Sequence, residues 1–407
     1  MRKIAFWLSL VMIFTIPWED IILIGGTNLT SLSKVIGYIV AGFWGLTILS
    51  EGRIRKFHLF HAFVLLFILW NVLSYIWSAN TDGTIFQIKT YGQIFLLILI
   101  VWELYKKPAD LTAGLQAYVL GSYVCIGSSI YNYINDIGAV KYEVRYSATG
   151  VNAVDLALLL SISIPIAWHL LLQADRKQNR FLKIINIAYI PLAIFAILLT
   201  GSRTSLFALI PAIIYIARPK RLDIGQFIII AVFLIASLFV ILSIIPQAVI
   251  DRLATTASSI SSEDIGGRVN IWRDALAVFS QHPFIGVGTG THNYTIGGSA
   301  HNTYLSVLAE SGLIGLFLFF FILALVLNQA ARLFKEYAGL WFSVFFVWAI
   351  GVLSLSWEVK KVTWLILSFV ILEGAALQEY YLAEKLKSKV SETEKNQSLP
   401  SGVESEV

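Results

Sequence analysis

The residues best suited to chemistry lie in the segment from about 247 to 301, which interrupts an otherwise apolar chain. Arg268 stands near its middle, a glycine-rich run follows at 286–290, and His301 stands at its end. An arginine fork binds phosphate through paired hydrogen bonds. A histidine can take a proton near neutral pH. Such residues gathered in a loop of an apolar chain favour a site of chemistry over a mere connection between spans.

Arg268 opens a stretch with the spacing of an amphipathic helix, whose apolar residues are Val269, Trp272, Leu276 and Phe279. Such a helix is expected to lie along a membrane surface. Its first amides and the guanidinium would together suit a phosphate group. The simpler interpretation is a surface charge paired with Glu263 or Asp264, and Arg273 points elsewhere on the same helix.

Arg203 lies in the segment 200–205, between two apolar runs. An arginine at membrane depth is costly, so it usually faces a cavity and a partner. Two interpretations fit this position equally. Arg203 either grips an anionic group at the outer membrane surface, or it reaches to the interface as a topological stop.

His301 precedes an apolar helical run, and a lone histidine there is more often an interface residue than a catalyst. His282 and His292 share its loop, but their spacing matches no zinc pattern and no carboxylate cluster joins them. We therefore expect no metal and no other cofactor. Glu310, inside the apolar run, is expected to be a structural tie to another helix.

A glycine-rich run at 286–290 resembles a nucleotide-binding loop; it reads Gly286-Val287-Gly288-Thr289-Gly290. The helix pattern that should follow such a loop is missing, and a lone glycine cluster is weak evidence. We interpret the run as a tight turn that lets the backbone approach a neighbour or a ligand.

The whole chain is apolar: 57% of its 407 residues are hydrophobic, 14% are charged, and the mean hydropathy is +0.75. Apolar runs of about 18 or more residues recur, the length that a membrane-spanning helix needs. These runs lack the alternation of barrel strands, so the chain is predicted to be an all-α integral membrane protein. The lone Cys125 is expected in the core, and the net charge of +5 does not indicate nucleic acid.

Twelve spans are predicted, and residues 1–383 form the membrane domain. The spans cover roughly 4–24, 33–50, 58–78, 84–104, 110–132, 151–173, 182–200, 202–217, 224–246, 302–328, 338–357 and 361–379. The first resembles a signal peptide, but no small-residue cleavage site follows it, so we expect an uncleaved span. The polar tail 384–407 is expected to be disordered.

Charge orients these spans. With the N-terminus inside, 16 of the 30 basic residues fall in short inner segments. They are Arg2, Lys3, Arg53, Arg55, Lys56, Lys106, Lys107, Arg176, Lys177, Arg180, Lys183, Arg218, Lys220, Arg221, Arg332 and Lys335. By the positive-inside rule both termini are cytoplasmic, and the loop 247–301 and a smaller loop 133–150 lie outside.

The ordered motifs resemble those of the O-antigen ligase and polymerase superfamily, the Wzy-C type membrane glycosyltransferases. They are a Gly-Ser-Arg at a helix junction, Arg268 ahead of Trp272, the segment 283–288, and the segments 301–305 and 310–315. Each motif alone is weak, and the order makes the set fairly specific. The motif-bearing part covers roughly 200–320.

The resemblance implies a GT-C-type helical bundle in a bacterial cytoplasmic (inner) membrane. It implies glycan transfer from undecaprenyl diphosphate to an acceptor on the outer face, without metal. Family arginines that bind the diphosphate match Arg203 and Arg268, and the family base matches His301. Gly288, Asn302 and Tyr304 are candidates for supporting roles.

Several functions fit this pattern. A ligase would use a lipid A-core acceptor, and a repeat-unit polymerase would use another lipid-linked glycan. A flippase or transporter for lipid-linked sugars is the alternative from a different class, and it predicts repeat symmetry and charges near the midplane. The chain has no evident repeat, and its polar groups gather toward the outer side, which favours a transferase. Membrane lipids are expected partners and nucleic acid is not.

Overall fold

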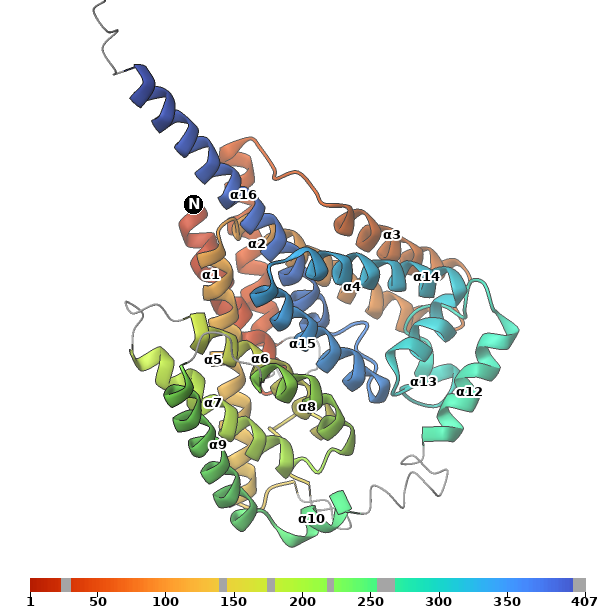
Figure 1. Ribbon diagram of the computed structural model, residues 1–407. Helices are drawn as coiled ribbons and strands as arrows, with labels where there is room; N and C mark the ends of the chain where they lie inside the picture. The colour runs from red at the N-terminus through yellow and green to blue at the C-terminus, as the bar shows by residue number, and fades with distance from the viewer. Residues whose placement is uncertain (23–30, 139–144, 174–179, 218–222, 255–267, 398–407) are drawn as a thin grey trace, which may run out of the picture.

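The computed structural model describes residues 1–407 except 23–30, 139–144, 174–179, 218–222, 255–267 and 398–407 (Figure 1). In these described ranges the elements are α-helices and short 3-10 helices. Since unbroken apolar helices satisfy their own backbone hydrogen bonds, this is the arrangement that a bilayer demands. The predicted all-α membrane fold is confirmed.

Helices stand at all twelve positions where spans are predicted. They are α1 (Arg2–Thr15), α2 (Leu32–Glu51), α3 (Leu59–Leu73), α4 (Thr81–Leu104), α5 (Pro108–Ile134), α6 (Ala153–Gln173), α7 (Arg180–Leu199), α8 (Arg203–Ile216), α9 (Ile224–Ile244), α14 (Thr303–Arg332), α15 (Lys335–Gly351) and α16 (Lys361–Gln397). Short 3-10 helices extend α1, α3 and α15: η1 (Ile16–Trp18), η3 (Ser74–Ile76) and η4 (Val352–Ser354). The predicted outer loop holds α10 (Gln247–Ala254), α12 (Arg268–Gln281) and α13 (His292–Thr295).

Nine helices in the described ranges are long and apolar enough to cross a membrane. Of the twelve, α1 and α8 have only 14 residues each, and α5, with 27 residues, has buried Gly, Ser, Gln and Asn residues. The count of twelve spans stays a prediction. The most deeply buried spans are α6 and α16, and α9 is the most exposed.

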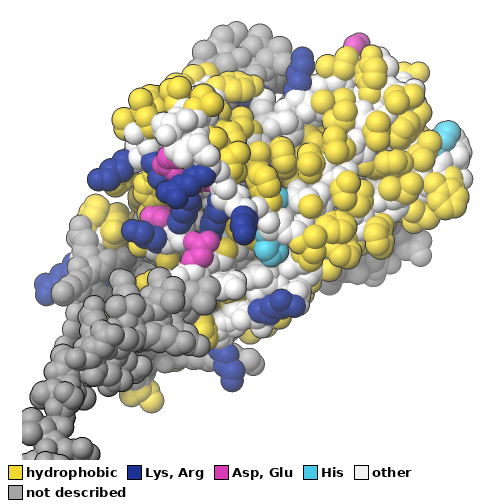
Figure 2. Space-filling view, turned by 90° about the horizontal axis from the view of Figure 1, so that it is seen from above, with side chains coloured by type: hydrophobic (Ala, Val, Ile, Leu, Met, Phe, Trp, Pro, Cys, Tyr) yellow, Lys and Arg dark blue, Asp and Glu magenta, His cyan; other side chains and the backbone are white. Residues whose placement is uncertain are grey.

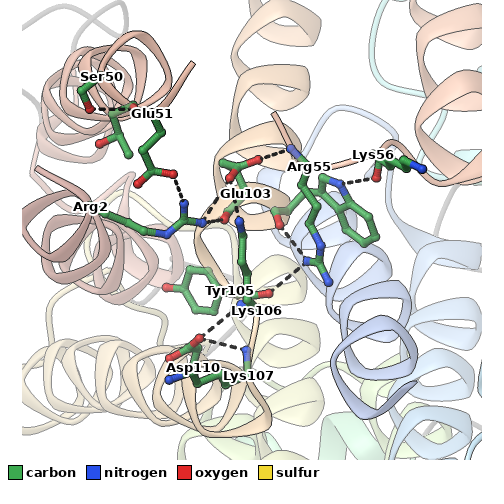
Figure 3. Close-up of polar contacts among 12 residues, drawn as sticks. Arg2, Ser50, Glu51, Arg55, Lys56, Glu103, Tyr105, Lys106, Lys107 and Asp110 are labelled. Carbon is green, nitrogen blue, oxygen red and sulfur yellow. Dashed lines mark hydrogen bonds and ion pairs between the residues drawn. The ribbon is translucent and has the colours of Figure 1, made fainter. Parts of the chain in front are cut away.

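One end of the bundle is tied by ion pairs between segments that are far apart in the sequence (Figure 3). Arg2 pairs with Glu51 at 2.8 Å and with Glu103 at 3.1 Å. Arg55 pairs with Glu379 at 2.7 Å, and its guanidinium carbon lies 4.1 Å from the ring centroid of Trp102. All of these positions were predicted to lie at inner ends of spans.

Seen from above Figure 1, Lys and Arg side chains gather with a few acidic ones beside a broad hydrophobic surface (Figure 2). A second group of ion pairs joins the residues just after η1 to the beginning of α16. Lys360 pairs with Asp20 at 3.3 Å, and Lys361 pairs with Glu19. Lys360 and Lys361 were predicted to lie in or beside an outer segment, and Glu19 and Asp20 lie in the outer part of the first predicted span, 4–24. The ion pairs therefore join predicted outer segments to each other and predicted inner segments to each other.

The final helix is longer than predicted. α16 continues to Gln397, whereas the composition from about Glu384 onward predicted a tail without structure. Its extension contains Ala, Leu, Glu and Lys, which have high intrinsic helix propensity, and this explains why a polar sequence continues a membrane helix.

Candidate active site

The helix that follows the outer loop is broken near its start. Gly312 has φ 64° and ψ −168° inside α14, so the helix is interrupted there. A Cβ atom on Gly312 would lie 2.3 Å from the carbonyl oxygen of Phe284. Glycine is therefore required both for the backbone angle and for the close approach.

The loop 283–288 binds the backbone groups that this break leaves without helical partners. The N–H groups of Val287 and Gly288 donate to the carbonyls of Ala309 and Glu310, and the N–H groups of Leu313 and Ile314 donate to those of Pro283 and Phe284. These distances are 3.1, 2.9, 2.9 and 3.3 Å, respectively. The loop is thus fixed to α14 on both sides of the break.

The glycine-rich run forms the tight turn that we predicted. Gly286, Gly288 and Gly290 all have positive φ, at 68°, 97° and 75°. A Cβ on Gly288 would lie 2.8 Å from the Cα of Ser78, and one on Gly290 would lie 2.4 Å from a backbone oxygen. The run packs against the chain itself, which accounts for its glycines without a nucleotide.

Glu310 has a structural role, as expected, but it ties α14 to the loop rather than to another membrane helix. Its Oε1 accepts hydrogen bonds from the N–H groups of Thr291 at 2.9 Å and His292 at 3.2 Å. The His292 ring contacts the Ser306 hydroxyl at 2.6 Å, and that hydroxyl donates to Glu358 at 2.6 Å. Burial raises the pKa of Glu358 to about 8. Glu358 joins a buried polar network that we did not predict.

His301 immediately precedes α14 with an unusual backbone. Its φ of 47° lies in the left-handed region, which non-glycine residues seldom adopt and which marks functional sites. The next residue, Asn302, caps the helix, because its Oδ1 accepts from the N–H groups of Tyr304 and Leu305 at 3.0 and 3.2 Å. The cap holds His301 at a fixed point outside the first turn.

Arg268 lies near enough to His301 for its charge to act on the imidazole ring. It begins α12, as predicted, and the Trp272 indole on the next turn donates to the carbonyl of Ala300 at 3.2 Å. Burial lowers the pKa of His301, the positive charge of Arg268 lowers it further, and Asp155 raises it. The predicted base is therefore neutral at pH 7 and stands in the field of a predicted phosphate-binding arginine.

Asp155 was missed in the sequence. Its Oδ1 accepts from the Trp357 indole at 2.7 Å, and the backbone N–H of Trp357 donates to the Thr303 hydroxyl at 2.8 Å. Asp155 thereby connects α6 to the residues that follow His301. The available signal was an aspartate near the beginning of a predicted span, where an ionisable group usually has a partner.

Arg203 begins α8, and the residue after it, Thr204, contacts the segment that also contacts Ser299 near His301. The Thr204 hydroxyl contacts Ser354 at 2.6 Å, and the Ser299 hydroxyl, beside His301, donates to Ser356 at 2.9 Å. Two residues of chain span at most about 7 Å. The start of α8 and the segment before His301 are therefore attached to neighbouring points of one connecting segment.

The three candidate supporting residues have structural contacts. Gly288 makes the close approach to Ser78, Asn302 is the helix cap, and the Tyr304 hydroxyl donates to the Ala349 carbonyl at 3.4 Å. Glu263 and Asp264, named above as partners for Arg268, lie outside the described residues.

Metal-ligating side chains do not converge in the described part of the chain, where no group of three His, Cys, Asp or Glu side chains could hold an ion. A cavity of about 470 Å³ between α6, α8 and α15, lined by His169, Tyr215 and Lys335 among others, contains none of the predicted site residues. The polar contacts of the candidate site therefore lie apart from this cavity.

Comparison with known proteins places this region in a family. Residues 188–320 match the family described as O-antigen ligase (Wzy_C), and the match includes Arg203, Arg268 and His301. No curated protein matches the chain. The matched segment runs from within α7 to a point in α14 beyond the break at Gly312, and it contains all three predicted site residues. The segment 188–320 is therefore similar to the O-antigen ligase family, a family of glycosyltransferase-like membrane enzymes.

Proposed function

We propose that this protein is an O-antigen ligase that transfers a glycan from undecaprenyl diphosphate to lipid A-core on the outer face of the inner membrane. The observation that carries the proposal is the position of Arg268 near His301 within the family segment. A cation and a neutral imidazole at one place are what the cleavage of a sugar–diphosphate bond requires.

In this proposal the ring of His301 takes the proton from an acceptor hydroxyl. The acceptor oxygen then forms a bond to the anomeric carbon of the donor glycan, and the bond from that carbon to the diphosphate oxygen breaks. Undecaprenyl diphosphate leaves with the electron pair. Arg268 and Arg203 stabilise its developing charge by preorganised electrostatics.

The acid–base balance of this step needs no metal, and we propose that none takes part. The leaving group is already a good one, so the enzyme has to neutralise charge and deprotonate the acceptor. The lowered pKa of His301 keeps the ring able to accept a proton at neutral pH. Both termini are proposed to lie in the cytoplasm, which puts the site on the outer side.

Deletion of the gene, followed by gel analysis of surface polysaccharide, tests this proposal. A ligase deletion should remove capped lipopolysaccharide while polymer accumulates on its lipid carrier. Molecules capped with a single repeat unit would instead identify a repeat-unit polymerase. Loss of capped lipopolysaccharide with the repeat units retained on the inner leaflet would identify a flippase and overturn the transferase proposal.

A further inference from the structure

A groove of about 530 Å³ lies between α1 and α7, and its lining contains none of the residues of the candidate active site. Both helices pack against α5, which forms the floor of the groove. The wall from α1 consists of Trp7, Leu10, Val11 and Phe14, whose spacing places them on one face of that helix. Leu182 lines the wall from α7. Because Trp7 is 67% exposed, this wall is open to the surroundings rather than covered by protein.

The floor of the groove is low because α5 presents small side chains there. Ala109, Ala113 and Ala117 line it at intervals of four residues, which places them on one face of the helix. The amide of Gln116, the longest polar side chain in the lining, exchanges hydrogen bonds with Asn186 at 3.1 and 2.9 Å. This amide is thereby paired within the chain, and the groove offers a mainly apolar surface to its occupant.

Basic side chains stand at the starts of all three helices that form the groove. They are Lys3, Lys107, Arg180 and Lys183. Lys3 lies one helical turn before Trp7, on the same face of α1. Three of the four side chains are exposed, and Lys183 is half-buried. In the described part of the chain none of the four forms an ion pair, so their charges are available to a ligand.

The acidic side chains near this end of the groove are already engaged (Figure 3). Glu51 and Glu103 pair with Arg2 at 2.8 and 3.1 Å, and Glu103 also pairs with Lys106 at 3.1 Å. The Asp110 carboxylate accepts hydrogen bonds from two backbone N–H groups at 3.1 and 2.9 Å. Among the described residues, this end of the groove therefore carries a net positive charge.

An amphiphile with an apolar chain and an anionic headgroup matches both features of the groove. Inside a membrane the chain gains little from hydrophobic burial, because the surrounding lipid is equally apolar. Selection of the occupant must therefore come from packing of the chain and from attraction of the headgroup. A basic residue near the membrane surface strengthens the binding of an anionic lipid about fivefold.

We propose that this groove binds an anionic phospholipid. An acyl chain lies between α1 and α7, and the phosphate lies among the four basic side chains. By the predicted orientation these helix starts are cytoplasmic, so the lipid belongs to the inner leaflet, whereas the proposed glycan transfer takes place at the outer face. The inference therefore does not depend on the proposed function.

Native mass spectrometry of the purified full-length protein, titrated with dioleoyl phosphatidylglycerol or dioleoyl phosphatidylcholine, tests the proposal. Lys3→Gln and Lys107→Gln should each weaken the binding of phosphatidylglycerol about fivefold and leave that of phosphatidylcholine unchanged. Arg53→Gln is the matched control, because Arg53 is exposed between α2 and α3, at the same predicted side of the membrane and outside the groove. It should leave the affinity for both lipids unchanged.

Filling the groove provides a second test that leaves its charge intact. Ala113→Phe should weaken the binding of both lipids, because the larger side chain occupies the space of the acyl chain. Ile229→Phe adds bulk on the exposed face of α9, where Ile229 is 71% exposed, and should have no effect.

Three results would overturn the inference. The first is wild-type affinity for phosphatidylglycerol in Lys3→Gln, Lys107→Gln and Ala113→Phe. The second is an equal loss in Arg53→Gln, because the attraction would then belong to the whole basic surface rather than to the groove. The third is displacement of phosphatidylglycerol by a much lower concentration of undecaprenyl phosphate, which would identify the groove as a site for an isoprenoid carrier.

Discussion

At the scale of single residues, the candidate site combines backbone strain with opposing charges. His301 holds a left-handed φ of 47°, and its ring lies in the fields of both Arg268 and Asp155. Strained residues persist only where the surrounding structure enforces them, and they cluster at active sites. Here the cap at Asn302 and the contact from Trp272 to Ala300 provide that enforcement.

Asp155 should set the lower pH limit of activity. A base must be neutral, so activity falls as pH drops through the pKa of His301. The charge of Asp155 raises that pKa, and Asp155→Asn should therefore move the acid limb of the kcat/KM profile to lower pH. Asp274→Asn, on the exposed face of α12, is the matched control and should leave the profile in place. An acid limb that stays fixed or moves upward in Asp155→Asn would contradict this role.

Glu358 should make stability depend on pH. Its pKa is about 8 in the folded protein, and that of an unfolded glutamate is about 4.3. The folded state thus binds more protons in this window, so the free energy of unfolding should fall as pH rises through it, by up to about 1.4 kcal/mol per pH unit. Unfolding in detergent from pH 5 to 8 measures this. Glu358→Gln should reduce the dependence, and Asp82→Asn should not.

At the scale of elements, the break in α14 organises the site. The loop 283–288 supplies backbone partners on both sides of Gly312, and this attachment places the glycine-rich turn. Without the loop, backbone groups on both sides of the break in α14 would lack hydrogen-bond partners. The conformations of the loop and of the helix therefore stabilise each other.

Gly312→Ala should therefore destabilise the protein. The new methyl group would meet a carbonyl oxygen at 2.3 Å, and the residue would keep a strained φ. The cost should be about 1–3 kcal/mol or more in the free energy of unfolding. Gly92→Ala, in α4 with nothing within 4 Å of its added Cβ, should cost far less. Equal thermal unfolding midpoints in the two variants would show that the break is not required.

Sequence patterns predicted the positions of the helices but not the contacts and the break that shape the site. Hydropathy located the spans because each carries its own apolar signal, and the spacing after Arg268 located α12. The bond between Asp155 and Trp357 joins residues 202 positions apart, which local patterns do not reveal. The break at Gly312 was equally hidden, because a glycine inside an apolar run resembles any tolerated helix glycine.

At the scale of the whole molecule, polar contacts sort the segment ends into two groups. The cluster around Arg2, Glu51 and Glu103 joins ends predicted to be inner, and the pairs of Lys360 and Lys361 join ends predicted to be outer. The positive-inside rule then assigns the first group to the cytoplasm. The proposed chemistry depends on this assignment, because the acceptor lies outside.

Cysteine labelling should confirm the sidedness. In a Cys125→Ser background, Asn293→Cys, exposed in the predicted outer loop, should react with a membrane-impermeant thiol reagent once the outer membrane is permeabilised. Arg53→Cys, exposed between α2 and α3, should react only after the inner membrane is lysed. The opposite pattern would place the candidate site in the cytoplasm and remove it from its acceptor.

Glycan transfer by purified His301→Asn tests the central claim most directly. Asparagine tolerates the left-handed backbone at this position better than most residues, so the variant should fold, yet its amide cannot act as a base. We predict that transfer from a lipid-linked diphosphate donor is abolished while binding of a prenyl diphosphate stays near the wild-type value. Transfer at a rate close to that of the wild type would contradict the assignment of His301 as the base.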